Sequence, residues 1–216
     1  MEELEPGDVV ERDGYRIAPV PVNHRIPAFG YVIYEDERSG QFNPQEAVRL
    51  GLAPGPEFGR VQRGETVRGV SPEQVMGPPR PGRKVVISGD TTPCETVRIA
   101  AHRSDLLIHE ATFAQDERDR AADTFHSTAA QAAALAREAE VTMLALTHFS
   151  TRHPAALLRD EARAIFRPTV LPRDFDTIEI PFPERGEPRL VRWGEHHGLE
   201  AEGGVAAADP LRGSAS

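Results

Sequence analysis

Ionisable side chains stand at the ends of three consecutive apolar segments of this sequence. Asp90 ends "KVVISGD", His109 and Glu110 end "DLLIHE", and His148 ends "VTMLALTH". If these segments are neighbouring strands of an open α/β sheet, their carboxyl ends share the edge where such sheets bind ligands. Histidine and aspartate from separate elements are typical of a hydrolytic zinc site with an open coordination position.

Two further histidines occupy comparable places. His24 follows the apolar segment "APVPVN", and His126 precedes an alanine-rich segment. Each residue also has a structural interpretation, because a single loop histidine is more often hydrogen-bonded than a ligand, and Asp90 after a glycine suits a turn. The pattern as a whole favours a metal or catalytic site. The zinc-protease motif HExxH is excluded, because Phe113 takes the place of its second histidine.

Alternating strands and helices must position these side chains. We expect β segments at residues 14–24, 30–36, 84–90, 105–113, 141–148 and 175–181. We expect helices at residues 94–104, 128–140 and 154–166. Ser127 is the expected N-cap of the second helix, and Pro154 lies in the first turn of the third. This order predicts βαβ units and a largely parallel sheet with right-handed crossovers.

The segment at residues 40–82 has a different character. It is rich in glycine and proline and contains one short helical candidate, at residues 44–50. A connection of this length inside a compact domain is usually functional or disordered. We count seven basic residues here against three acidic ones, Glu57, Glu65 and Glu73, and this balance of 7 − 3 = +4 predicts a basic surface. The seven basic residues are Arg49, Arg60, Arg63, Arg68, Arg80, Arg83 and Lys84.

Composition limits the class of protein. The chain has 216 residues, enough for one domain, and lacks an apolar stretch of the roughly 20 residues that span a bilayer. The opening "MEELEPGDVV" does not resemble a signal peptide. Cys94 is the single cysteine, which excludes thiolate-cluster zinc sites and fits the cytoplasm. A net charge of -9 argues against general affinity for nucleic acid.

Six segments, in order along the chain, resemble the ribonuclease Z family of tRNA 3′-processing endonucleases in the metallo-β-lactamase superfamily. They are "HRIPAFGYVIYE", "GLAPGPEFGRVQRGETV", "GRKVVISGDTTP", "DLLIHEATF", "FHSTAAQAAALA" and "LTHFSTRH". The resemblance implies an α/β fold, mainly the C-terminal half of a metallo-β-lactamase-like αββα sandwich, over residues 1–187. It implies hydrolysis of a tRNA precursor at two Zn²⁺ ions. Residues 188–216 are expected to form a flexible tail.

The resemblance also implies residue roles. His24 and His148 look like terminal zinc ligands, and Asp90 looks like the carboxylate that bridges both ions. His126, oriented by Glu110, resembles the group that helps to protonate the leaving oxygen. Arg152 resembles a phosphate-clamping arginine. Residues 40–82 resemble a flexible arm that grips tRNA across a homodimer, and the matching residues are Gly55, Pro56, Arg60 and Arg63.

One part of the family's pattern is missing. The motif HxHxDH, which supplies most zinc ligands and the general base, occurs nowhere in the sequence. We therefore expect this chain alone to bind zinc poorly and to be inactive, and the motif to lie on a preceding or separate N-terminal half. Two alternatives stay open: a non-catalytic tRNA-binding or regulatory module, and another hydrolase of the metallo-β-lactamase type.

Overall fold

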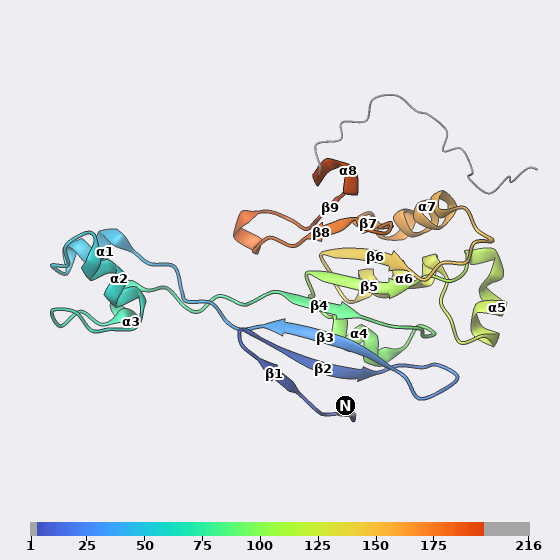
Figure 1. Ribbon diagram of the computed structural model, residues 1–216, viewed down its shortest axis with the longest axis horizontal. Coiled ribbons are helices and arrows are strands. Elements are labelled where there is room, and N and C mark those ends of the chain that lie inside the picture. The colour runs from blue at the N-terminus through green and yellow to red at the C-terminus, as the bar shows by residue number, and fades with distance from the viewer. Residues whose placement is uncertain (1–3, 197–216) are drawn as a thin grey trace, which may run out of the picture.

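A seven-stranded mixed sheet forms the centre of the computed structural model, which describes residues 4–196 (Figure 1). Its strands lie side by side in chain order: β1 (Val10–Arg12), β2 (Tyr15–Pro21), β3 (Phe29–Glu35), β4 (Lys84–Ile87), β5 (Leu106–Glu110), β6 (Met143–Thr147) and β7 (Thr169–Val170). Pairs from β1 to β4 are antiparallel, and pairs from β4 to β7 are parallel. The expected parallel βαβ region is thereby confirmed.

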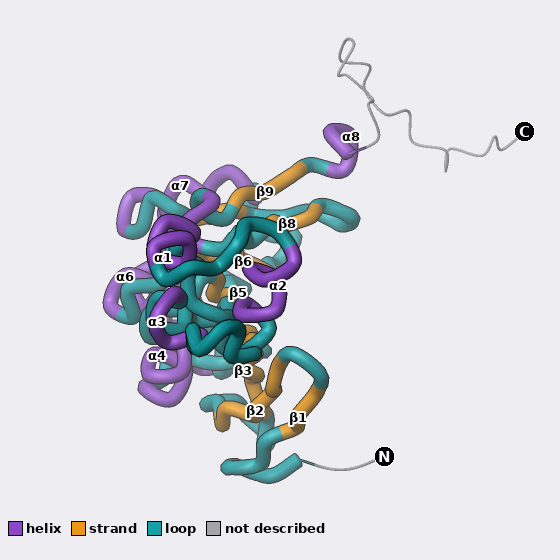
Figure 2. Tube along the Cα trace, turned by 90° about the vertical axis from the view of Figure 1, so that its left-hand side faces the viewer, coloured by secondary structure: helices purple, strands orange, loops and turns teal. Residues whose placement is uncertain are grey.

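Helices cover one face of this sheet (Figure 2). They are α4 (Glu95–Ala101), α6 (Ala129–Glu138) and α7 (Ala155–Ile165). Alternate strand residues, among them Val32, Val86 and Leu107, face these helices in the largest apolar cluster, because successive side chains of a strand point to opposite faces. Four alanines of α6 are fully buried, so this helix packs close to the strands; they are Ala129, Ala132, Ala133 and Ala136. The 3₁₀ turn η1 (Gln115–Glu117) and α5 (Arg118–Asp123) form a polar connection that the sequence analysis did not predict as helical.

The N-cap expected for α6 is wrong by one residue. Thr128, not Ser127, caps the helix, because its side chain accepts a hydrogen bond from the Gln131 N–H at 3.2 Å. The Gln131 side chain in turn accepts from the Thr128 N–H at 2.9 Å, which completes a capping box.

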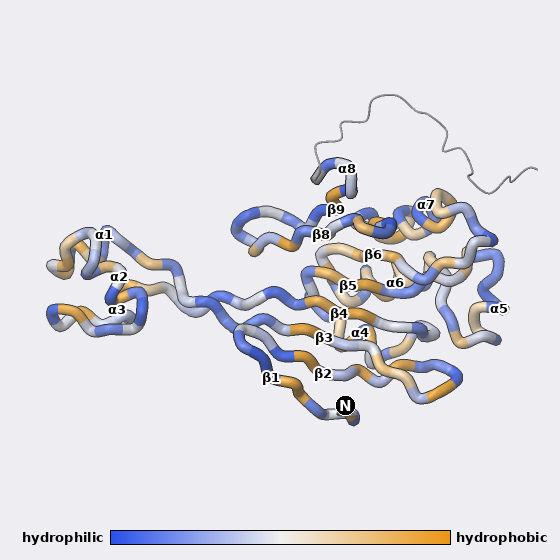
Figure 3. Tube along the Cα trace, in the orientation of Figure 1, coloured by the Kyte–Doolittle hydropathy of each residue, from blue (hydrophilic) through white to orange (hydrophobic). Residues whose placement is uncertain are grey.

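The second face of the sheet is only partly covered. A hairpin of β8 (Thr177–Glu179) and β9 (Arg189–Val191) places Ile178 and Ile180 against Leu106, Met143 and Ala145. Over β2 and β3 the same face lies open. There Tyr31 is 38% exposed, and Ile17, Ile33 and Ile87, which share its face, are half-buried. Figure 3 shows hydrophobic residues along β2, β3 and β4. A sheet with one open apolar side normally acquires a partner on that side.

Residues 40–82 form a compact arm rather than a disordered loop. The arm contains α1 (Pro44–Arg49), α2 (Pro56–Gln62) and α3 (Pro72–Val75), where the sequence analysis expected one helix. Figure 1 shows the arm standing away from the sheet on two extended segments of chain. Within the described part of the chain, its apolar core consists of the arm's own residues: Phe42, Ala47, Leu50, Leu52, Phe58, Val61, Val67, Val70, Val75 and Met76.

The expected basic surface of the arm is wrong. Glu46 also belongs to residues 40–82, whereas Arg83 and Lys84 lie outside them, so five arginines face four glutamates and the formal balance is 5 − 4 = +1. Three of the four glutamates form ion pairs within the arm, Arg49–Glu46, Arg60–Glu65 and Arg68–Glu57. The arm therefore offers paired charges rather than a uniform positive field.

The C-terminal region is more ordered than expected up to residue 196. Residues 189–191 form β9, and α8 (Trp193–His196) follows, inside the stretch predicted as a flexible tail. The turn between β8 and β9 includes the 3₁₀ helix η2 (Pro183–Arg185). The rest of the predicted tail, residues 197–216, lies outside the described residues. Among residues 4–196, no helix is both long enough and apolar enough to cross a membrane.

Candidate metal centre

The parallel strands bring the predicted site residues to one edge of the sheet. Asp90 follows β4, Glu110 ends β5 and His148 follows β6. The registers Ile87↔Ile108 and Glu110↔Thr147 align these strands, so their carboxyl ends lie side by side. Ligand sites of open α/β sheets occur at this edge.

Three side chains there come close enough to hold one metal ion. Asp90, His126 and His148 each present a possible ligand atom, and these atoms lie within 4.8 Å of one another. The rings of His126 and His148 are stacked with centroids 5.3 Å apart, and His148 Nδ1 lies 3.5 Å from Asp90 Oδ1. His24 stands next to this group, with its ring centroid 5.3 Å from that of His126.

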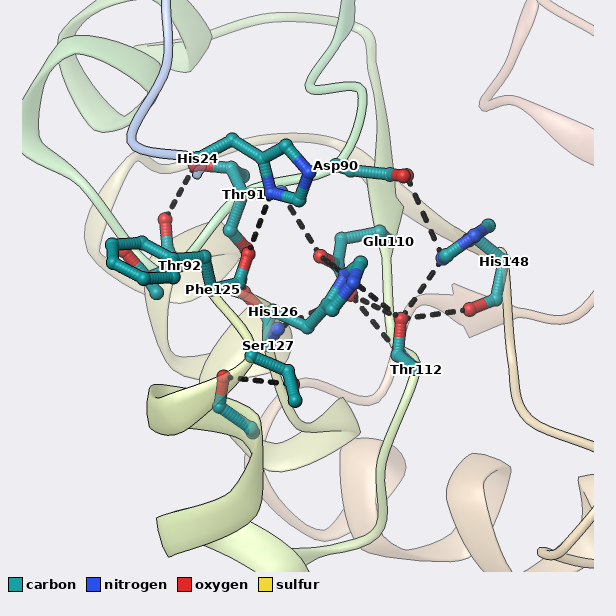
Figure 4. A network of polar contacts seen from close by, with 12 residues as sticks. His24, Asp90, Thr91, Thr92, Glu110, Thr112, Phe125, His126, Ser127 and His148 are labelled. Carbon is teal, nitrogen blue, oxygen red and sulfur yellow. Dashed lines mark hydrogen bonds and ion pairs between the residues drawn. The ribbon is translucent and has the colours of Figure 1, made fainter. Parts of the chain in front are cut away.

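All three histidines of the site hold one ring nitrogen against an acceptor (Figure 4). His24 Nδ1 donates to the Phe125 carbonyl at 3.1 Å, and His126 Nδ1 contacts Glu110 Oε1 at 2.7 Å. His148 Nδ1 contacts the Thr112 hydroxyl at 2.9 Å. Because Nδ1 is engaged in each ring, Nε2 is left as the nitrogen that can bind a metal ion. The hydrogen-bond partners of metal-binding histidines set the tautomer in this way.

The buried carboxylate of Glu110 organises the site. It is 1% exposed, and its two oxygens accept five hydrogen bonds. Oε1 accepts from the Thr91 N–H at 2.9 Å and from His126; Oε2 accepts from the Thr112 N–H at 3.1 Å, the Thr112 hydroxyl at 2.8 Å and the Ser127 N–H at 3.1 Å. Glu110 therefore ties the loops after β4, after β5 and before α6 to one point.

Thr112 is the residue that the sequence analysis missed. Its hydroxyl donates to Glu110, and the same oxygen lies 2.9 Å from His148 Nδ1 and 3.3 Å from His126 Nδ1. Because the hydroxyl proton goes to the carboxylate, the oxygen is left to accept from His148. Its place in the sequence, two residues after a strand-end glutamate, was the available signal.

Backbone conformation is unusual at three points around the site. Gly89, Phe125 and His148 have φ values of 64°, 62° and 51°. The left-handed region is costly for a residue with a side chain, and such conformations concentrate at functional sites. At Phe125 the conformation accompanies the carbonyl contact with His24.

His109 does not belong to the site. It neighbours Glu110 on β5, so its side chain points to the opposite face and is fully buried. Its Nδ1 lies 2.8 Å from the Glu110 carbonyl, and its Nε2 has no partner among the described residues. Burial in this apolar setting lowers the pKa of His109.

The remaining predicted residues are not part of the cluster of Asp90, His126 and His148. Arg152 is exposed in the loop after His148, where its N–H donates to Ser150 Oγ at 3.3 Å. In the same loop, His153 pairs through Nε2 with Glu117 at 2.6 Å. The four arm residues lie on or next to α2: Gly55, Pro56, Arg60 and Arg63.

Solved structures place this fold in a class. The metallo-beta-lactamase fold protein YhfI from Bacillus subtilis aligns with a TM-score of 0.51 and 18% identity, over 78% of this chain and 50% of that one. The short form of human tRNase Z aligns with a TM-score of 0.50 and 24% identity, over 80% and 46%. The chain therefore has an α/β fold of the metallo-β-lactamase type over part of the length of such proteins.

Sequence relatives narrow the class, although no family model matches the chain. The ribonuclease Z of Myxococcus xanthus is 49% identical over 189 residues, covering 84% of this chain and 62% of the relative. Those of Methanosarcina acetivorans and Halorubrum lacusprofundi are 44% and 45% identical, over 61% and 63% of their lengths. The chain is a homologue of ribonuclease Z, and it spans about three fifths of the length of these relatives.

Proposed function

We propose that this chain forms the C-terminal part of a zinc-dependent phosphodiester hydrolase that removes 3′ trailers from tRNA precursors. The observation that carries the proposal is the set of three histidines whose Nδ1 atoms are all engaged, next to Asp90 at the strand edge. The homology to ribonuclease Z agrees with this assignment.

The donor set fits Zn²⁺, which takes imidazole nitrogen and carboxylate oxygen in near-tetrahedral arrays. Asp90 and His148 would hold the metal, with His24 as the third ligand. Bound zinc would act as a Lewis acid toward a phosphate oxygen. Since His126, rather than His24, is within 4.8 Å of the other two ligand atoms, substitution of each histidine in turn will show which one binds.

His126 is suited to proton transfer. Its Nδ1 is hydrogen-bonded to the buried Glu110 carboxylate, which fixes the ring and leaves Nε2 as the nitrogen that would pass a proton to a leaving oxygen. Arg152, exposed in the loop four residues after His148, would bind a phosphate oxygen of the RNA. These two roles need no ligand from outside the chain.

A complete dinuclear site needs more ligands than the three proposed here. We propose that a segment with the HxHxDH motif supplies them, from the same polypeptide or a separate chain. The open apolar face over β2 and β3, where Tyr31 is exposed, supports this because it offers a surface on which such a segment could pack. A cytoplasmic homodimer, with the arm of one subunit gripping tRNA for the other, completes the proposal.

The first experiment measures zinc per chain after dialysis against trace metal, for the parent and for the Asp90→Ala, His24→Ala and His126→Ala variants. We expect substoichiometric zinc that falls further in Asp90→Ala and His24→Ala and persists in His126→Ala. Equal zinc content in the parent and Asp90→Ala would refute the proposed centre.

The second experiment uses a tRNA precursor with a 3′ trailer. We expect no cleavage by the chain alone and cleavage when a polypeptide with the HxHxDH motif is added. Binding that survives His148→Ala but is lost on replacing Arg60 and Arg63 would favour a non-catalytic tRNA-binding module. Cleavage of a small ester without cleavage of RNA would favour another hydrolase.

A further inference from the structure

The arm joins the sheet through a stalk of two extended segments, residues 36–41 and 77–83 (Figure 1). Among residues 4–196, the arm's apolar core includes no residue of the sheet, so the stalk is what connects the two. The stalk's two segments pair at Arg38 and Arg80, whose backbone groups exchange hydrogen bonds of 2.8 and 2.9 Å. Further out they cross closely, because a Cβ on Gly40 would lie 1.8 Å from the Gly77 carbonyl oxygen.

One carboxylate joins both segments of the stalk at this point. Glu184, in the turn between β8 and β9, accepts hydrogen bonds from Arg38 Nη1 at 2.7 Å and Nη2 at 3.2 Å. The same side chain accepts from Arg80 Nη1 at 2.7 Å. Such a bidentate contact restricts the orientation of a guanidinium group as well as its position.

The aromatic ring of Phe182 also contacts arginines at the base of the stalk. The guanidinium carbon of Arg38 lies 3.6 Å from the ring centroid of Phe182, and that of Arg83 lies 4.7 Å from it. Arg83 also donates to the Ile180 carbonyl at 2.7 Å and pairs with Glu35 at the end of β3. Both cations are therefore held against the ring by electrostatic attraction to its face.

The turn that provides these groups is itself fixed to the sheet. Ile178 and Ile180 pack in the apolar cluster on the second face. The arm is inserted between β3 and β4, whereas this turn comes about a hundred residues later in the sequence, so a distant part of the chain braces the arm's base.

We propose that the β8–β9 turn, through Phe182 and Glu184, is a positioning element that sets the direction of the arm relative to the metal centre. Without it the arm would still fold on its own core but would sample a wider range of directions. A ligand that contacts the arm and the centre together, which under the proposed function is an RNA, would then bind more weakly.

The test measures the direction of the arm by the distance between two spin labels. In a Cys94→Ser background, labels are attached through Val48→Cys on α1 and Ile99→Cys on α4, two exposed positions. Electron–electron double resonance then gives the distribution of distances, and neither metal nor RNA is needed.

The test variant combines Phe182→Leu with Glu184→Gln. Its matched control is Glu179→Gln, which removes the Arg189–Glu179 ion pair of the same hairpin without a contact to the stalk. We expect the distribution to widen about twofold in the test variant, because the competing arm directions become populated, and to stay unchanged in the control. Equal widths in the two variants would overturn the proposal.

Folding does not confound this comparison, since Glu184 is 42% exposed, and the single Glu184→Gln variant should widen the distribution in the same direction. Under the proposed function, the double variant should bind a whole tRNA precursor about fivefold more weakly, with unchanged binding of an acceptor-stem hairpin too short to reach the arm. If neither RNA binds the parent, the proposed function fails, and the label distances still decide the role of the turn.

Discussion

Replacing Glu110 with glutamine should destabilise the protein markedly, although the change removes only a charge. The carboxylate accepts five hydrogen bonds in a buried position, and every partner is a donor in the native arrangement. A glutamine amide presents one acceptor and one donor group. Whichever way it is turned, its NH₂ group faces donors that previously faced oxygen.

The cost depends on which oxygen is replaced. An NH₂ at the Oε1 position deprives the Thr91 N–H of its acceptor, while His126 can change tautomer and accept. An NH₂ at the Oε2 position deprives two backbone N–H groups, those of Thr112 and Ser127, so the first orientation is favoured. One buried unpaired N–H costs about 1–3 kcal/mol, and each remaining bond loses roughly 1 kcal/mol of charge assistance. Neutralising a buried charge returns part of this, which leaves a net loss of about 2–4 kcal/mol.

Urea unfolding followed by far-ultraviolet circular dichroism measures this loss. The matched control is Glu140→Gln, whose side chain is 59% exposed and pairs with Arg103 at the surface. We expect the control to change the free energy of unfolding by about 0.5 kcal/mol or less. A Glu110→Gln protein that unfolds within about 1 kcal/mol of the parent would contradict the view that this carboxylate holds the site together.

Three further predictions concern the arm and the buried histidine. Gly40→Ala should lower the thermal midpoint of the protein because its Cβ would overlap the Gly77 carbonyl, whereas Gly59→Ala, inside α2 and facing only a flexible arginine end, should raise or preserve it. Burial lowers the pKa of His109 below its usual 6.5, so the unfolded chain binds a proton that the folded chain resists. The free energy of unfolding should therefore fall as the pH drops below about 6.5, by at most about 1.4 kcal/mol per pH unit. Chemical unfolding between pH 5 and 7 should show a smaller fall for His109→Gln than for the parent. Hydrogen bonds from Arg38, with the charge of Arg80, lower the pKa of Glu184 to about 2. The spin-label distances of the arm should thus be the same at pH 7 and pH 4, and widening at pH 4 would show that the carboxylate is protonated there.

Much of the sheet could be predicted from the sequence. Short apolar segments that alternate with helical segments predict a parallel sheet. The strands of such a sheet are buried on both faces, so they appear in a sequence as continuous apolar runs. The same pattern places Asp90, Glu110 and His148 at strand ends, and the shared edge of a parallel sheet brings them together. Two of the arm's three helices, α2 and α3, were missed because the arm's apolar residues are scattered among glycines and prolines and meet only when the chain folds back on itself.

The error at the N-cap of α6 has a physical reason in the site. Ser127 and Thr128 both carry a hydroxyl that can cap a helix. The Ser127 hydroxyl is already used, since it donates to the Thr91 carbonyl at 2.7 Å, and the Ser127 N–H donates to Glu110. The loop geometry of the site therefore leaves the cap to Thr128.

The sequence by itself determined which residues could do chemistry and at which strand ends they stand, because residue type and hydrophobic period are local properties. Only the tertiary structure decided their roles. In the sequence, His109 and Glu110 are neighbours and equally plausible as site residues. Alternation along β5 places His109 in the apolar core and Glu110 in the site. The contacts of Thr112 with His148, and of Glu184 with the stalk of the arm, join segments far apart in the chain. Such contacts depend on packing between elements, which no local pattern encodes.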